Sequence, residues 1–247
     1  MNAPSVSNSD PFPTTRWSQV VQAGQDHSSA EMALNGLCGK YWRPVYAFAR
    51  HRGFGPEDAE DASQEFFCRL IERGYLERAD RSRGKFRAFL VHDFKLFLAK
   101  CVERKNALKR GGGVTHLSLD VTGAEAVLDL PGRGAMDPET YFDRQWALEM
   151  VRHARESVKQ SYEGQGKGKL YELLREGLTK VPDAEIYTRW SESLGMSEGS
   201  LRVALHRLRE RFRAAMEAQI METVTNRDDL KAEMRHLRNA LGEASAT

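Results

Sequence analysis

Residues 187–213 have the sequence YTRWSESLGMSEGSLRVALHRLRERFR, and they decide the fold of the carboxy-terminal half. Apolar residues recur at helical spacing on both sides of a short turn. Gly195 stands where the end of a first helix needs a left-handed residue, and Ser197 has the side chain of a helix cap. We therefore predict a helix-turn-helix over about residues 183–216, whose second helix buries Leu201, Leu205, Leu208 and Phe212.

The second helix of this motif has a polar and basic face opposite its apolar stripe. The first turns of such a helix can reach base edges in the major groove, and later arginines can bind phosphates. The adjacent pair Val203-Ala204 favours apolar contact with thymine methyl groups. On these residues alone, a helical hairpin with a solvated basic face remains the alternative. The residues predicted to contact DNA are Ser197, Ser200, Arg202, Val203, His206, Arg207, Arg209 and Arg211.

Helical spacing continues over most of the chain from residue 14 onward, and long alternating β-branched runs are absent, so we predict an all-α protein. The polar segment 1–13 is expected to be disordered. The other expected helices cover about residues 14–23, 29–52, 56–72, 85–109, 138–160, 169–178 and 227–241.

Charge is distributed unevenly along the chain. Residues 81–110 carry ten Lys or Arg against two acidic residues, whereas residues 115–143 carry six acidic residues against one Arg. Segment 111–137 is acidic and Gly-rich without a sustained period, which is typical of a flexible linker. We therefore expect two helical domains, 14–110 and 138–222, joined by this linker, and a helical extension at 223–247 that either docks on the second domain or binds a regulator.

The sequence also argues against several classes of protein. The polar start predicts no signal peptide, and no apolar run is long enough to span a bilayer, so we expect a cytoplasmic protein without membrane insertion. The three cysteines have no metal-ligand spacing. Catalytic motifs such as HExxH or a P-loop are absent, and Asp58, Asp61 and Glu65 alone would not complete a metal site. We expect no enzyme, no metal and no cofactor.

Several stretches resemble one family of proteins. GPEDAEDASQEFFCRL (55–70) looks like region 2.2 of bacterial RNA polymerase sigma factors of the extracytoplasmic-function (ECF) group. YWRPVYAFARHRG (41–53) is similar to region 2.1, residues 84–110 are similar to regions 2.3 and 2.4, and residues 187–213 resemble region 4. The segments TTRW (14–17), RGYLERAD (73–80) and KRGGG (109–113) resemble a longer subgroup found in planctomycetes and related bacteria.

The resemblance implies a factor that binds core RNA polymerase and directs it to promoter DNA. Region 2 would fill residues 14–110 and region 4 residues 138–222. The positions that match the polymerase-docking motif are Asp61, Gln64 and Glu65. The positions implied at the −10 element are Tyr75, Arg78, Arg81, Arg83, Lys85, Arg87, Lys95, Arg104, Lys105, Lys109 and Arg110, and region 4 would bind the −35 element. Lys95-Leu96 departs from the family's usual Arg-Asn pair, which puts base-specific −10 contacts in doubt.

Three functions remain to be compared. The first is a sigma factor, which acts only through polymerase and could have an anti-sigma or other regulatory protein as a further partner. The second is a stand-alone helix-turn-helix transcriptional regulator with an amino-terminal sensor. The third, an enzyme targeted to DNA by the motif, lacks any recognisable set of catalytic residues.

Overall fold

The computed structural model describes residues 15–16, 27–71, 85–108 and 136–242, and every regular element within them is helical. This confirms the predicted all-α fold class. The predicted segment 1–13, most of the helix at 14–23, the loop at 73–84 and the linker up to residue 135 lie outside the described residues. The helices are α2 (His27–His51), α3 (Pro56–Ile71), α4 (Phe86–Leu108), α5 (Pro138–Glu163), α6 (Gly168–Leu174), η4 (Arg175–Leu178), α7 (Ala184–Leu194), α8 (Glu198–Met221) and α9 (Arg227–Gly242).

Local sequence signals explain where these helices begin. Asp137 caps α5 by accepting hydrogen bonds from the backbone nitrogens of Glu139 and Thr140, at 3.0 and 3.2 Å. Pro138 follows at the first helical position, where its missing N–H costs nothing. α3 likewise begins with Pro56, and its first turn is acidic, which suits the positive end of the helix dipole.

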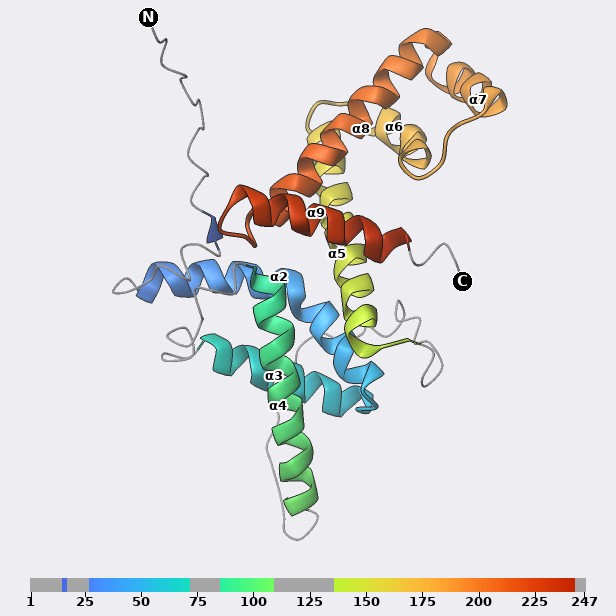
Figure 1. Ribbon diagram of the computed structural model, residues 1–247. Helices are drawn as coiled ribbons and strands as arrows, with labels where there is room; N and C mark the ends of the chain where they lie inside the picture. The colour runs from blue at the N-terminus through green and yellow to red at the C-terminus, as the bar shows by residue number, and fades with distance from the viewer. Residues whose placement is uncertain (1–14, 17–26, 72–84, 109–135, 243–247) are drawn as a thin grey trace, which may run out of the picture.

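Two long helices connect the two ends of the molecule. Figure 1 shows α2, α3 and α4 at one end and α6 and α7 at the other, with α5 and α8 packed against each other between them. α9 crosses this pair near the middle and packs on both helices. The helix predicted at 227–241 is thus confirmed, and it is docked on α5 and α8.

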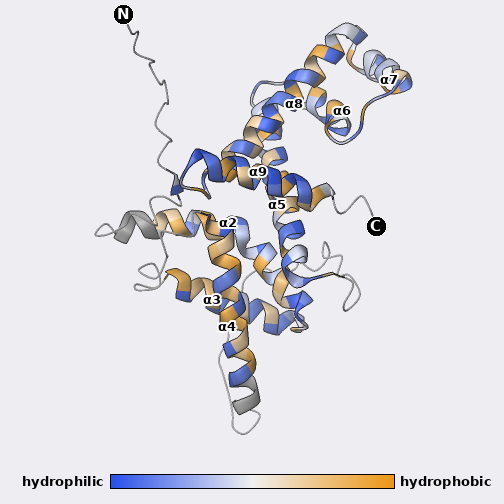
Figure 2. Cartoon of the chain, in the orientation of Figure 1, coloured by the Kyte–Doolittle hydropathy of each residue, from blue (hydrophilic) through white to orange (hydrophobic). Residues whose placement is uncertain are grey.

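The larger hydrophobic core lies between α2, α3 and α4 and continues onto later helices. Figure 2 shows apolar residues gathered where these three helices meet. The aromatic rings of Phe66 and Phe94 lie 4.8 Å apart there, and Phe48 joins Phe94 to Phe142 of α5. The same core includes the amino-terminal part of α5, the end of α8 and the buried side of α9.

A second, smaller core supports the helix-turn-helix. It contains Val158 and Tyr162 from the end of α5 together with buried residues of α6, α7 and the first half of α8. The two cores therefore meet within α5 and α8 and not at the predicted domain boundary near residue 138. The predicted ranges 14–110 and 138–222 stay a prediction about functional parts, but their helices share one packed body.

A cluster of buried charges joins α4, α5 and α9. Glu233 of α9 is fully buried and accepts hydrogen bonds from Arg87 of α4 at 2.9 and 3.1 Å. The Arg87 guanidinium also donates to Asp143 of α5, and Lys85 lies 3.4 Å from Glu233. His236 is 2.7 Å from the other oxygen of Asp143. Because a buried carboxylate is costly without partners, these contacts tie the three helices together.

The segment between α8 and α9 is held against the start of α4. The backbone nitrogen of Phe86 donates to the carbonyl of Thr223 at 2.9 Å, and Lys85 and Val224 form an isolated antiparallel bridge. The Thr15 hydroxyl donates to the Val224 carbonyl at 2.6 Å. Parts of the chain more than two hundred residues apart therefore meet where α8 gives way to α9.

Glu149 of α5 is a second buried carboxylate, outside this cluster. Burial alone would raise its pKa, but hydrogen bonds from His153 and Arg152 and the charges of Arg152 and Arg43 outweigh burial and lower it to about 2. Arg152 contacts Glu149 through two nitrogens at 3.1 and 2.6 Å. The carboxylate is therefore ionised at neutral pH, and its charge contributes to stability.

Candidate nucleic-acid interface

The helix-turn-helix forms where the sequence predicts it, because each of its ends is capped locally. Asp183 accepts a hydrogen bond from the Ile186 nitrogen at 2.9 Å and caps α7. Gly195 ends α7 in the left-handed conformation with φ 64°, which a residue with a Cβ adopts only with strain. Ser197 then caps α8 through the Ser200 nitrogen, and the Ser191 hydroxyl donates to the Met196 carbonyl at 2.6 Å across the turn.

The predicted DNA-facing residues of α8 lie mostly on one exposed side. Val203 is 51% exposed, and Ala204 beside it is half-buried. Arg202 stacks over the Tyr187 ring at 4.3 Å and lies 3.6 Å from Glu198. The other exposed members of the predicted set are Ser197, Ser200, His206, Arg207 and Arg211.

Arg209 departs from this pattern. Its guanidinium donates to the Gly177 carbonyl at 2.9 and 2.8 Å and to the Lys180 carbonyl at 3.4 Å. It therefore ties the segment after η4 to α8, on the side of α8 away from Val203 and Arg207. The structure therefore shows a structural contact for Arg209, and its predicted contact with DNA stays a prediction.

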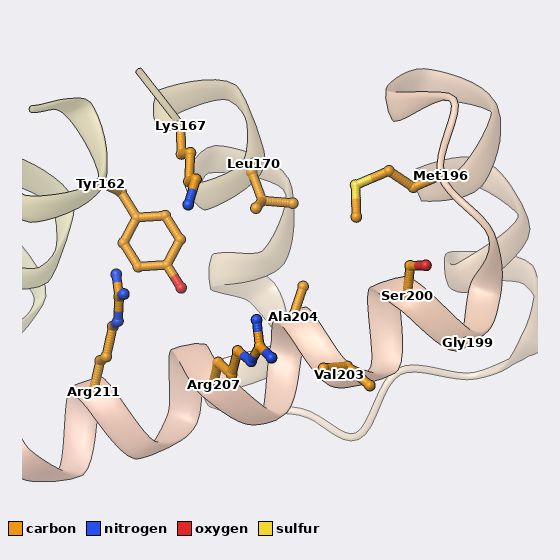
Figure 3. Close-up of a pocket in the computed structure, with 10 residues that line it drawn as sticks. All are labelled: Tyr162, Lys167, Leu170, Met196, Gly199, Ser200, Val203, Ala204, Arg207 and Arg211. Atoms are coloured by element: carbon orange, nitrogen blue, oxygen red, sulfur yellow. The ribbon is translucent and has the colours of Figure 1, made fainter. Parts of the chain in front are cut away.

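A groove runs beside the exposed side of α8. It encloses about 520 Å³, and Figure 3 shows its walls coming from α8 on one side and from the α5 end, the following turn and α6 on the other. Met196 and Ser200 lie toward one end of this groove and Tyr162 and Arg211 toward the other. The lining residues are Tyr162, Lys167, Leu170, Met196, Gly199, Ser200, Val203, Ala204, Arg207 and Arg211.

Sequence reasoning missed the far wall of this groove. Lys167 belongs to the stretch GQGKGK (164–169), which the sequence marks only as a Gly-rich turn. The two lysines of this stretch, Lys167 and Lys169, were the signal that could have pointed to it, because lysine side chains are common phosphate contacts in DNA-binding proteins.

The residues predicted at the −10 element are partly outside the described chain. The residues outside the described chain are Tyr75, Arg78, Arg81, Arg83, Lys109 and Arg110, and the side chain of Lys105 is also outside it. Lys95 is exposed on α4 and pairs with Glu139 of α5. Lys85 and Arg87, in contrast, are paired with buried or half-buried carboxylates. Lys85 pairs with Glu233, and Arg87 pairs with both Glu233 and Asp143. The Arg87 side chain is only 13% exposed. The prediction that Arg87 belongs to a basic DNA-binding face is therefore corrected.

The predicted polymerase-docking residues share one side of α3. Asp61, Gln64 and Glu65 are all half-buried, and Gln64 donates to Glu60 at 3.1 Å. Arg104 of α4 binds both oxygens of Glu65, at 3.0 and 2.9 Å. A hydrogen bond from Arg104 lowers the pKa of Glu65 despite burial, and the charge of Arg69 adds to this. Two residues expected on separate surfaces, Glu65 and Arg104, thus form one ion pair between α3 and α4.

In the part of the chain that the structure describes, no three His, Cys, Asp or Glu side chains are grouped so that they could hold a metal ion. No described helix is both long and apolar enough to cross a membrane.

Comparison with known proteins identifies part of the chain. Residues 37–92, which run from α2 into α4, match the family described as sigma-70 region 2. The match supports a factor of the sigma-70 family with a role in promoter recognition. No curated protein and no solved structure matches the chain significantly.

Proposed function

We propose that this protein is an ECF sigma factor that binds core RNA polymerase and directs it to promoters. One observation carries the proposal: the sigma-70 region 2 match and a capped helix-turn-helix with an exposed basic helix occur in one molecule. In this proposal α3 docks on polymerase, the region around α4 binds the −10 element, and α8 binds the −35 element. Such a factor would work in the cytoplasm, where polymerase and promoters meet.

The longer planctomycete-type subgroup is part of the same proposal. Its support is the resemblance of the TTRW segment (14–17) to that subgroup. In this segment Thr15 is hydrogen-bonded to Val224, and Arg16 lies 3.4 Å from Glu222. An early motif and the carboxy-terminal extension are therefore parts of one contact. An anti-sigma protein, if it is a partner, would have to bind a molecule in which α9 is already docked on α5 and α8.

Polymerase docking can be tested with charge reversal on α3. Asp61→Arg combined with Gln64→Ala should abolish binding to core polymerase and transcription from a cognate promoter, because it reverses an acidic docking surface. Glu57→Arg is the matched control, since Glu57 is exposed in the first turn of the same helix but outside the docking motif. Helix content measured by circular dichroism should be unchanged in both variants.

A transcription assay with the wild-type chain separates a sigma factor from a stand-alone regulator. A sigma factor added to core polymerase initiates at specific promoters in a transcription assay on genomic DNA. A chain that binds such DNA tightly by itself, and never joins core polymerase, would be a stand-alone regulator. Unchanged core affinity in the double variant would remove α3 from the docking surface.

A further inference from the structure

The groove beside α8 has an unusual balance of charge. Its ten lining residues include three cations, Lys167, Arg207 and Arg211, and no carboxylate. Among the described residues, Lys167 and Arg207 form no ion pair. Elsewhere on the helix-turn-helix, in contrast, Arg202 pairs with Glu198 and Arg189 with Glu176. The groove therefore presents positive charge that the described part of the protein does not neutralise.

The backbone around Lys167 is fixed. Gly166 has φ +69°, and its nitrogen donates to the Glu163 carbonyl at 2.9 Å. The Lys167 nitrogen donates to the Tyr162 carbonyl at 2.8 Å, and the Lys167 carbonyl accepts from Tyr171 at 3.1 Å. The turn is thus closed on both sides of Lys167, and Figure 3 shows its side chain extending from this turn toward the groove.

Arg211 is placed by an aromatic ring. Its guanidinium lies 5.1 Å from the centre of the Tyr162 ring, and Tyr162 is buried. One of its nitrogens is 3.5 Å from the amide oxygen of Gln165, at the limit of a hydrogen bond. Stacking on a buried ring orients a guanidinium and leaves its N–H groups available to an acceptor such as a phosphate.

Much of the rest of the groove is apolar. Leu170, Met196, Val203 and Ala204 line the part that extends from Lys167 and Arg207 toward Ser200. Charge along an apolar surface suits the sugar-phosphate backbone of a nucleic acid, in which anionic oxygens alternate with apolar sugar edges. An isolated small anion would make no use of the apolar part.

We propose that this groove binds the phosphate backbone of duplex DNA and that Lys167 is a phosphate contact outside the helix-turn-helix. The proposal rests on the proposed function, in which α8 contacts promoter DNA. A duplex held against Ser200, Val203 and Arg207 has one backbone strand beside the far wall of the groove, where Lys167 stands. The contact would position the duplex on α8 without distinguishing one sequence from another.

The experiment compares Lys167→Gln with Lys180→Gln in the full chain. Lys180 is exposed in the same half of the molecule. Its backbone carbonyl is bound by Arg209, which lies about 200° around α8 from Arg207. Lys180 is therefore the control, because it lies on the side of α8 away from the groove. The probe is a fluorescein-labelled duplex that the wild-type chain selects from random-sequence DNA. Its affinity is measured by anisotropy at several salt concentrations, with the chain alone and with the chain joined to core polymerase.

Loss of one phosphate contact lowers the slope of log affinity against log salt by about 0.9. Lys167→Gln should show this decrease, Lys180→Gln should not, and Lys167→Arg should keep most of the wild-type slope. The affinity lost should be the same for selected and unrelated duplexes. Because the slope can be measured without polymerase, the result is independent of whether the chain joins core.

Three results would overturn the proposal. The first is a wild-type slope in Lys167→Gln, or an equal decrease in both variants. The second is a wild-type chain that selects no duplex, either alone or with core polymerase. The third is an affinity loss in Lys167→Gln that is larger for the selected duplex than for unrelated duplexes, since a contact to the backbone does not distinguish one sequence from another. A chain that shows the Lys167 effect but never joins core would keep this groove and refute the sigma function.

Discussion

Glu233 of α9 offers the sharpest test of how the long helices are held together. Its side chain is fully buried, and both of its oxygens are bound by Arg87. Replacing it with Gln keeps the shape of the side chain and removes its negative charge. Arg87 and Lys85 would then lose the carboxylate that lies between them, whereas Asp143 would remain beside Arg87.

The expected cost follows from burial. Breaking a buried ion pair by removing one partner typically costs about 3 to 5 kcal/mol, because a buried charge is left without compensation. Arg87 retains Asp143, and a Gln side chain can still accept one hydrogen bond, so the lower end of that range applies. We expect Glu233→Gln to reduce the free energy of unfolding by about 3 kcal/mol.

Urea denaturation followed by tryptophan fluorescence measures this loss. Trp146 is a suitable probe because it is buried and Arg87 lies 5.2 Å from its ring. For a urea slope near 2 to 3 kcal/mol per M, the midpoint should fall by about 1 M. Asp228→Asn is the matched control on the same helix, since the Asp228 side chain is 96% exposed and its change should stay within about 0.5 kcal/mol.

A double-mutant cycle decides whether the effect comes from the ion pair. If Arg87→Met and Glu233→Gln act through their mutual contact, their combined cost should be well below the sum of the separate costs. Equal midpoints for Glu233→Gln and Asp228→Asn would refute the reasoning, and so would strictly additive effects of the two buried changes.

Two other positions give independent tests. Gly177→Ala should destabilise the helix-turn-helix by about 1 to 3 kcal/mol in thermal or urea denaturation, because the new Cβ would lie 2.7 Å from Leu205. Gly39→Ala meets nothing within 4 Å inside a helix and should stabilise by up to about 1 kcal/mol, so equal losses would contradict the packing argument. The pKa of Glu149 falls from 4.5 to about 2 on folding, so its contribution is present above the unfolded value and is lost as pH falls toward the folded one. Between about pH 5 and about pH 3 the wild type should lose about 1 to 2 kcal/mol more than Glu149→Gln, after allowance for the exposed Arg152, and parallel pH profiles would refute this.

The sequence predicts the helices of this protein well because their boundaries are set locally. Asp137, Asp183, Gly195 and Ser197 each act on backbone groups within four residues, so a short window contains both the cap and what it caps. The same locality explains why the exposed side of α8 was found from spacing alone.

Packing between distant segments could not be predicted in the same way. Arg87 lies in a basic stretch, and only the fold shows that a carboxylate 146 residues later meets it. Arg104 and Glu65 are likewise 39 residues apart and were expected on separate surfaces. Spacing on one helix indicates which face a residue occupies, but it does not indicate which other helix covers that face.

The sharing of α5 and α8 by both hydrophobic cores limits how the chain can change in length. An added residue in α5 between Ala154 and Val158 would turn the following helix by about 100° and move it by about 1.5 Å. α8 packs against α5, and its own buried residues also face both cores. A change in the length of one helix could therefore be accommodated only by a matching change in the other. In proteins with this fold, insertions and deletions should therefore occur in the turns around α6 and α7. The lengths of α5 and α8 should change only together.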